Sequence, residues 1–146
     1  MTLKQLSVFL ENKPGALTQP CRLLAQAGIN ILTFALADTQ QFGILRLVVP
    51  DWQQAKKVLE QNGCVVKVND VVAIEVPDRP GGLADLLAVL EPAQVNVEYV
   101  YAFTAKQRGK GLMLFRFDNP EKAVAALQAG KVNTVGTAEL FKRLAG

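Results

Sequence analysis

The chain has 146 residues, of which 50% are hydrophobic and 20% charged, and its net charge is +3. This balance is typical of an ordered globular protein and excludes a largely disordered one. Histidine is absent, which excludes Ser-His-Asp and Cys-His catalysis and removes the commonest ligand of transition metals. We therefore expect no metal site, and no motif points to a cofactor.

The N-terminal residues and the cysteines indicate a cytoplasmic location. Residues 1–5 lack the apolar segment of a signal peptide, and no apolar stretch approaches the roughly 20 residues needed to span a bilayer. The two cysteines, Cys21 and Cys64, belong to no Cys-x-x-Cys motif. We expect both to be reduced and packed inside the protein.

The first third of the chain predicts a strand, a loop and a helix. Apolar residues at every second position from Leu6 to Leu10 predict a strand whose even-numbered side chains face the core. A Pro-Gly loop follows, and an apolar period from Leu17 to Leu24 predicts a helix. Pro20 fits only the first turn of that helix, so either the regular helix begins near Thr18 as N-cap or its start is kinked.

Two β-rich runs come next, at 29–37 and 42–49, and a short polar turn joins them. Asp51 is a candidate N-cap for a second helix that ends at Gly63. A last strand at 64–68 continues directly into the next segment. The predicted order is strand, helix, strand, strand, helix, strand.

The same order then repeats. The segment 78–83 (DRPGGL) matches 12–17 (NKPGAL), and Asn96 matches Asn30, both at an offset of 66 (78 − 12 = 66 and 96 − 30 = 66). A constant offset between separate motifs indicates a duplicated unit. We therefore expect two domains, at residues 1–69 and 70–146, with an extra helix at 137–144.

Each copy predicts a ferredoxin-like α+β sandwich, in which an antiparallel four-stranded sheet carries both helices on one face. The opposite face of the first sheet should then be apolar, which predicts burial against another sheet and hence a homodimer. The side chains expected on that face are Leu32, Phe34, Leu36, Phe42, Ile44 and Val48.

The Pro-Gly loops place backbone amides at helix N-termini, which favours binding of a carboxylate or phosphate. A simple tight turn is the alternative interpretation of such a loop. However, each copy also has an asparagine, Asn30 or Asn96, directly before a strand, where asparagine is a poor strand former. A side-chain amide both donates and accepts hydrogen bonds, and this suits a zwitterionic ligand.

These residues, NKPGAL with GINI and DRPGGL with QVNV, resemble the ACT domain, a small βαββαβ module that senses amino acids in metabolic regulation. The resemblance covers nearly the whole chain. It implies two domains side by side that form an eight-stranded antiparallel sheet with helices on one face, and a ligand in the seam between them.

The resemblance implies two pseudo-equivalent ligand sites. The first combines Asn12, Gly15, Ala16 and Leu17 with Asn96. The second combines Asp78, Gly81, Gly82 and Leu83 with Asn30. Asp78 adds a negative charge that Asn12 lacks, so we expect unequal affinities.

The implied function is that of a non-catalytic regulatory protein, which binds a small amino acid and controls a metabolic enzyme or regulator. Serine-responsive members often carry a polar side chain two places before the loop Asn or Asp. Leu10 and Val76 stand there in this chain, which favours an apolar or aromatic amino acid. The seam forms either within one chain or between two.

Three alternatives stay open. An RNA-recognition module has the same element order, and Lys110–Phe117 resembles its RNP1 motif, although Leu112 and Leu114 occupy the aromatic positions. A basic cluster at Lys106, Arg108 and Lys110 is expected to be a solvated hairpin tip. A small enzyme is the second alternative, but Glu75 and Glu98 are expected to be exposed or salt-bridged. A structural adaptor without a ligand is the third.

Overall fold

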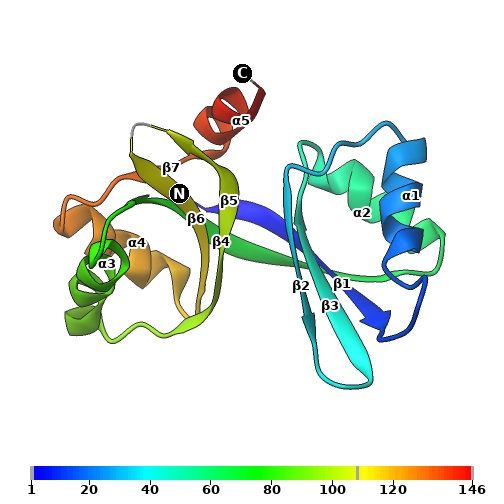
Figure 1. Cartoon of the computed structure of the whole chain (residues 1–146), viewed down its shortest axis with the longest axis horizontal. Coiled ribbons are helices and arrows are strands. Elements are labelled where there is room, and N and C mark those ends of the chain that lie inside the picture. Colours follow the sequence, from blue (N-terminus) through cyan, green and yellow to red (C-terminus); the bar gives the residue numbers. More distant parts are fainter. Residues whose placement is uncertain (1, 108, 146) are drawn as a thin grey trace. The chain divides into compact units, whose positions relative to one another are not determined.

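A computed structural model describes residues 2–107 and 109–145 of the chain. It divides into two compact units (Figure 1). We call Lys4–Asn69 the N-terminal unit, and Asp70–Gly146 together with Met1–Leu3 the C-terminal unit. Of the predicted basic cluster, Arg108 and the side chain of Lys106 lie outside the described residues.

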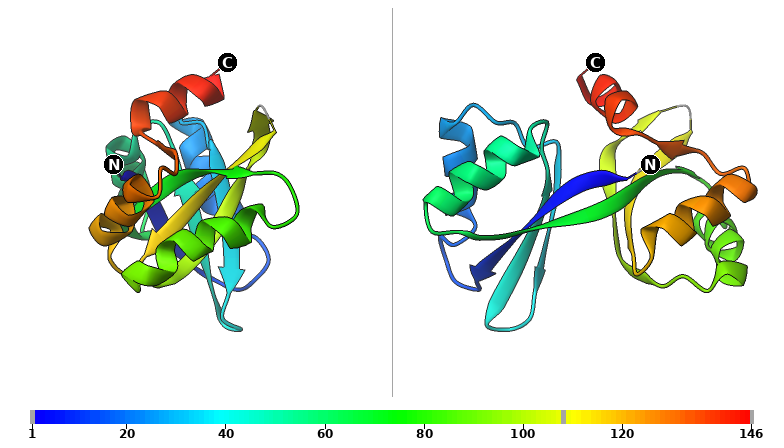
Figure 2. Two further views of the ribbon diagram at one scale, coloured as in Figure 1. Left: turned by 90° about the vertical axis from the view of Figure 1, so that its left-hand side faces the viewer. Right: turned by 180° about the vertical axis from the view of Figure 1, so that it is seen from behind.

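The N-terminal unit is an antiparallel sheet with two helices on one face (Figure 2). The strand order β2-β3-β1-β4 places β3 between β1 and β2. A right-handed crossover from β1 to β2 leaves room for β3 between them. Its elements are β1 (Leu3–Glu11), α1 (Thr18–Gln26), β2 (Thr33–Asp38), β3 (Phe42–Val48), α2 (Trp52–Gln61) and the first part of β4 (Val65–Pro77).

The core of this unit lies between the sheet and its two helices. Leu6 and Val8 are fully buried, which confirms the predicted inward face of β1. Leu24 of α1 and Leu59 of α2 are also fully buried against them. Each such side chain stabilises the fold by about 1.5–3 kcal/mol relative to an exposed position.

The C-terminal unit repeats the arrangement with the strand order β5-β6-β4, and β7 pairs with the other edge of β4. Val72, Ile74 and Val76, which correspond to Leu6, Val8 and Leu10 at the offset of 66, all belong to its core. Its further elements are α3 (Gly82–Leu90), η1 (Glu91–Ala93), β5 (Val97–Gln107), β6 (Lys110–Phe117), α4 (Pro120–Ala129), β7 (Thr134–Val135) and α5 (Thr137–Ala145).

The prediction of eight strands is wrong, because the described residues form seven. The strand β4 runs without a break through Asn69 and Asp70, so one strand serves as the last of the first unit and the first of the second. Two hydrogen bonds hold these polar residues in the strand. Ser7 Oγ donates to Asn69 Oδ1 at 2.7 Å, and Arg116 Nη1 donates to the Asp70 carbonyl at 2.8 Å.

The predicted apolar face of the N-terminal sheet is only partly correct. Phe34 and Leu36 pair with Leu47 and Leu45, which face the core, so they lie on the helix side of the sheet. Phe42, Ile44 and Val48 lie on the opposite face, as expected, and Leu32 precedes β2. A shift of one residue in the register moves every side chain of a strand to the other face. The observed register of β2 against β3 places Phe34 and Leu36 on the helix side.

A second difference is that α5 packs on the face of the C-terminal sheet opposite α3 and α4. Glu75 lies between the core residues Ile74 and Val76, so its side chain points to that opposite face. Arg143 of α5 forms an ion pair with it at 2.6 Å, and Leu140 is fully buried. Helices therefore cover both faces of this sheet, where one covered face was expected.

No helix in the described part of the chain combines the length and apolar character that a membrane crossing needs. Cys21 and Cys64 are both free thiols, as expected. Burial raises the pKa of the Cys64 thiol, which keeps it protonated and unreactive.

Candidate functional site

The two Pro-Gly loops share two backbone hydrogen bonds. In the first loop, the Lys13 amide donates to the Glu11 carbonyl at 3.0 Å and the Ala16 amide to the Lys13 carbonyl at 3.3 Å. The second loop repeats both bonds at the offset of 66, from Arg79 to Pro77 and from Gly82 to Arg79, each at 3.0 Å. The prediction of two equivalent loops is thus consistent with their turn geometry.

A glycine in the left-handed conformation completes each loop. Gly15 has a φ of +84° and Gly81 a φ of +83°. Residues other than glycine adopt this backbone conformation only at a cost of about 1–2 kcal/mol. The glycine of the motif is therefore required by the turn that leads into the helix.

The helices that follow these loops begin without a side-chain cap. Neither α1 nor α3 has such a hydrogen bond, and α1 begins at Thr18 with Leu17 as N-cap, so the prediction of Thr18 as N-cap is wrong by one residue. By contrast, Asp51 caps α2 and Asn119 caps α4, each through a 3.1 Å hydrogen bond. The first-turn amides of α1 and α3 are therefore available to an external acceptor.

Asn30 and Asn96 both have exposed side chains; Asn96 stands directly before β5, whereas β2 begins three residues after Asn30, at Thr33. Within residues 2–107 and 109–145, neither side-chain amide makes a hydrogen bond. The backbone of Asn96 is held by Asp118, whose side chain accepts from its amide at 2.9 Å and whose amide donates to its carbonyl at 3.1 Å. The strand start is fixed there, while the side chain remains available to a ligand.

Asn12 differs from these two, because its side chain is already engaged. Its Nδ2 donates to the Gln40 carbonyl at 2.8 Å, and its backbone amide donates to the Gln41 carbonyl at 2.9 Å. In the second loop the Asp78 amide donates to the Gly109 carbonyl at 3.0 Å. Asn12 therefore links the loop to the β2–β3 turn, which sequence reasoning did not foresee.

Each unit contains one half of the predicted residues. The N-terminal unit contains Asn12, Gly15, Ala16, Leu17 and Asn30, and the C-terminal unit contains Asp78, Gly81, Gly82, Leu83 and Asn96. The predicted sites each combine a loop of one unit with the asparagine of the other. That combination stays a prediction.

An open surface groove of about 530 Å³ runs from the first loop along α1. Gly15 lies at its start, and Arg22 is the charged side chain in its lining. The remaining lining residues are Thr18, Gln19, Leu23 and Gln26.

The second loop is more closely packed and carries an internal ion pair. A Cβ on Gly82 would lie 2.1 Å from the Pro77 carbonyl oxygen, whereas its counterpart Ala16 carries a Cβ without difficulty. Arg79 also pairs with Asp85 of the first turn of α3 at 2.8 Å, and α1 has no acidic residue in its first turn. An internal carboxylate thus partly offsets the positive end of the α3 dipole.

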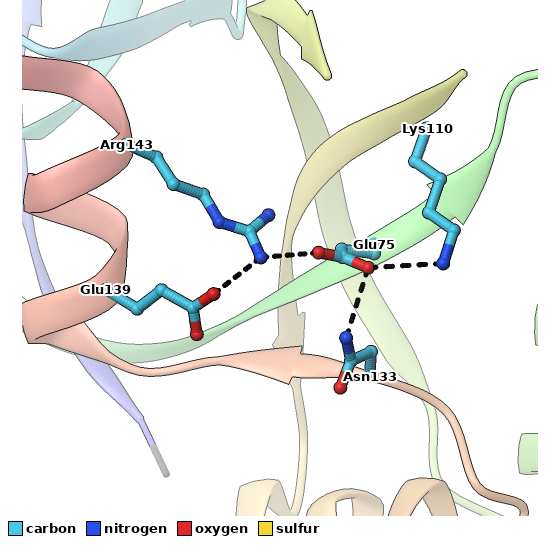
Figure 3. A network of polar contacts seen from close by, with 5 residues as sticks. All are labelled: Glu75, Lys110, Asn133, Glu139 and Arg143. Carbon is cyan, nitrogen blue, oxygen red and sulfur yellow. Dashed lines mark hydrogen bonds and ion pairs between the residues drawn. The ribbon is translucent and has the colours of Figure 1, made fainter. Parts of the chain in front are cut away.

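The densest polar cluster of the described residues surrounds Glu75 (Figure 3). Arg143 Nη2 lies 2.6 Å from Glu75 Oε1 and 2.6 Å from Glu139 Oε1. The other carboxylate oxygen, Oε2, accepts from Asn133 Nδ2 at 3.2 Å and lies 3.5 Å from Lys110 Nζ. These residues come from four separate segments of the chain, so no local motif indicates the cluster.

This cluster serves to hold α5 rather than to catalyse a reaction. Burial disfavours the charged carboxylate, but hydrogen bonds from Arg143 and Asn133 and the charges of Arg143 and Lys110 outweigh it and lower the pKa of Glu75. The pKa of Arg143 is raised, chiefly by its hydrogen bonds to Glu139 and Glu75. A carboxylate with a lowered pKa is a weak general base. The prediction that Glu75 is salt-bridged is confirmed.

Other features of the site weigh against the remaining alternatives. Glu98 pairs with Arg116 at 3.3 Å, as expected for a structural carboxylate. Leu112 and Leu114, at the aromatic positions of the RNP1-like segment, are buried on the sheet face that α5 covers. Tyr99 and Tyr101 of β5 lie on the same face, with ring centroids 6.5 Å apart, but the RNP1-like positions themselves carry no aromatic ring to stack on bases. The described residues contain no cluster of three side chains suited to a metal ion.

Comparisons with known proteins agree with this fold. Protein BT0572 from Bacteroides thetaiotaomicron has a similar structure, with a TM-score of 0.89 and 38% sequence identity, and the match covers 97% of both chains. The ligand-free regulatory subunit of aspartate kinase from Thermus thermophilus matches with a TM-score of 0.65 and 18% identity, over 88% of this chain and 90% of that one. At that identity the likeness concerns the fold.

A curated relative is the acetolactate synthase small subunit of Buchnera aphidicola subsp. Baizongia pistaciae (strain Bp), which is 36% identical over 76 residues. That match covers 51% of this chain and 47% of the relative, so the chain spans about half of the relative's length. The sequence model of the ACT domain pair matches residues 1–144. The chain therefore belongs to the ACT domain pair family.

Proposed function

We propose that this protein is a non-catalytic regulatory protein that binds a free amino acid and controls a metabolic enzyme or regulator. The observation that carries the proposal is the repetition of one arrangement in both units: a helix start without a side-chain cap and an asparagine with an unengaged amide. The similarity to a small subunit of acetolactate synthase, and the fold shared with a regulatory subunit of aspartate kinase, support it.

The binding mode follows from the polar groups at the loops. The α-carboxylate accepts hydrogen bonds from the first-turn amides of α1 or α3, where the helix dipole also favours negative charge. The ammonium group donates to the side-chain carbonyl of Asn30 or Asn96, which no described residue occupies. In this proposal the asparagine and the loop belong to different units, either of one chain or of two.

The side chain of the ligand is apolar or aromatic in this proposal. Leu10, two places before Asn12, packs against the core of the N-terminal unit, and Val76 is buried in the core of the other unit. Neither offers a polar group to a ligand. A serine side chain would find no hydrogen-bond partner at these two positions.

The two sites are proposed to differ in affinity. Asp85 and Asp78 place negative charge near the second loop, which disfavours a ligand carboxylate there. The first loop has no acidic residue in the first turn of its helix and has Arg22 in the adjacent groove. We therefore assign the tighter site to the first loop.

A homodimer remains part of the proposal, with the apolar residues revised by the observed register. Phe9 and Phe42 are 37% and 56% exposed on the face opposite α1 and α2. Phe34 and Leu36 are 59% and 50% exposed on the edge strand β2. Exposed apolar side chains at this density favour burial against a second copy.

Calorimetric titration of the protein with each of the twenty amino acids tests the function. We expect at least one apolar or aromatic amino acid to bind, and Asn30→Ala and Asn96→Ala each to weaken binding at one site. Gln53→Ala, an exposed amide on α2, is the matched control and should bind as the wild type does. Absence of binding at millimolar concentration of every amino acid would leave the ligand-free adaptor as the correct interpretation.

A further inference from the structure

The tip of the β2–β3 hairpin has a strained conformation. Gln40 has a φ of +70°, although it is not a glycine, and the Gln41 amide donates to the Thr39 carbonyl at 2.9 Å. A positive φ with an i to i+2 hydrogen bond is characteristic of a γ-turn, which is rare and strained. Such strain persists only where surrounding contacts hold it in place.

Asn12 supplies those contacts from the Pro-Gly loop. Its side-chain Nδ2 donates to the Gln40 carbonyl at 2.8 Å, directly at the strained residue. Its backbone amide donates to the next carbonyl, that of Gln41, at 2.9 Å. One residue of the loop thus holds two successive carbonyls of the hairpin tip.

We propose that Asn12 is a positioning residue, which ties the first Pro-Gly loop to the tip of the β2–β3 hairpin and transmits ligand binding at the loop to the edge strand β2. The inference rests on the proposed function for the ligand, but the tie itself is independent of it. Asn12 acts on the ligand through the loop geometry, and its Nδ2 is committed to Gln40.

The second unit lacks the side-chain part of this tie. Asp78 replaces Asn12, and a carboxylate has no N–H to donate to a carbonyl. The Asp78 amide donates to the Gly109 carbonyl at 3.0 Å, as the Asn12 amide does to the Gln41 carbonyl. The left-handed residue described at that tip is Gly109, with a φ of +70°, for which the conformation carries no strain. The strained turn and the side-chain donor therefore occur together in the first unit.

The hydrogen bonds of Asn12 connect the first Pro-Gly loop to the turn that follows the exposed edge strand β2. The strand β2 ends at Asp38, immediately before the turn, and it lies at the edge of the sheet. Its Phe34 and Leu36 side chains are exposed. A shift of the loop on ligand binding moves the turn through Asn12 and so changes the presentation of this strand.

A second-site rescue tests the proposal, with Asn12→Ala, Gln40→Gly and the double variant compared with the wild type. Loss of one neutral hydrogen bond should weaken binding of the best-bound amino acid by about three- to tenfold in N12A. Glycine adopts the positive φ without strain, so Q40G added to N12A should restore the affinity to within about twofold. Asn12→Asp, which keeps the shape without the donor, should resemble N12A.

If N12A weakens binding and Q40G restores nothing, Asn12 contacts the ligand directly and the proposal is overturned. Hydrogen exchange of the Gln41 amide provides a readout that needs no ligand. It should be about three- to tenfold faster in N12A than in the wild type and slow again in the double variant. Unchanged exchange in N12A would overturn the tie. If the wild type binds none of the twenty amino acids, the proposed function and the transmission step both fail, while the exchange result still decides the tie.

Discussion

Replacing Arg143 by Met should destabilise the C-terminal unit by about 2 kcal/mol. Methionine keeps the apolar stem that packs against the sheet but removes both ion pairs. Exposed ion pairs contribute about 0–1 kcal/mol, whereas breaking a buried pair costs about 3–5 kcal/mol. The side chains of Arg143 and Glu75 are 23% and 11% exposed, so the expected cost lies between these limits. Lys110 and Asn133 still partly compensate the carboxylate that remains.

The aromatic residues of the chain allow each unit to be followed separately during urea unfolding. Its one tryptophan, Trp52, lies in the N-terminal unit, and both tyrosines, Tyr99 and Tyr101, lie in the C-terminal unit. The midpoint of the tyrosine near-UV signal should fall by about 1 M urea in R143M. The midpoint of the tryptophan fluorescence should move less. Glu139→Gln, which removes only the exposed i,i+4 partner, should cost about 0.5 kcal/mol or less.

The effect of R143M should also depend on pH. The pKa of Glu75 in the folded protein is lowered, so the ion pair stabilises the fold fully above the unfolded-state pKa of about 4.3. That contribution is lost as the pH falls through the lower folded-state pKa. The difference between wild type and R143M should therefore be complete at pH 7 and should shrink in strong acid. An unchanged tyrosine midpoint in R143M at pH 7 would refute this reasoning. So would a difference between wild type and R143M that is as large in strong acid as at pH 7.

Three further substitutions test other parts of the structure. Gly82→Ala should cost about 1–3 kcal/mol in tyrosine-detected urea unfolding, because its Cβ would lie 2.1 Å from a backbone oxygen; a cost no greater than that of Gly111→Ala, whose Cβ would meet only the Val76 carbonyl oxygen at 3.8 Å, would contradict the close approach. Leu140→Ala should cost about 2–5 kcal/mol by the same assay, since this side chain of α5 is fully buried; a neutral result would mean that α5 is not docked. Asp85→Asn should tighten the weaker of two calorimetric binding steps, because it removes a negative charge from the start of α3; weaker binding would reverse the assigned order of the sites.

The duplication made most of the fold predictable from the sequence. Each copy indicated where the elements of the other begin, and the caps at Asp51 and Asn119 follow from local residue preferences. The inward face of β1 was also correct, because Leu6, Val8 and Leu10 recur at every second position and the first two are fully buried. These are properties of short segments, which sequence patterns describe well.

The features that were missed depend on contacts between distant segments. The face on which Phe34 lies is decided by the register of β2 against β3, which the apolar run alone does not fix. The position of α5 depends on an ion pair between residues 68 positions apart, Glu75 and Arg143, and the first copy has no counterpart of this helix for comparison. The role of Asn12 was hidden because its partner, Gln40, lies on another loop.

The central claim is that the helix starts of α1 and α3 bind the carboxylate of a free amino acid. An NMR titration of isotopically labelled protein with the twenty amino acids follows the backbone amides directly. We predict that the best ligand shifts the amide signals of Leu17 and Thr18 first, and those of Leu83 and Ala84 at higher concentration. Saturable shifts confined to residues away from both loops, with these four amides unchanged, would contradict the account.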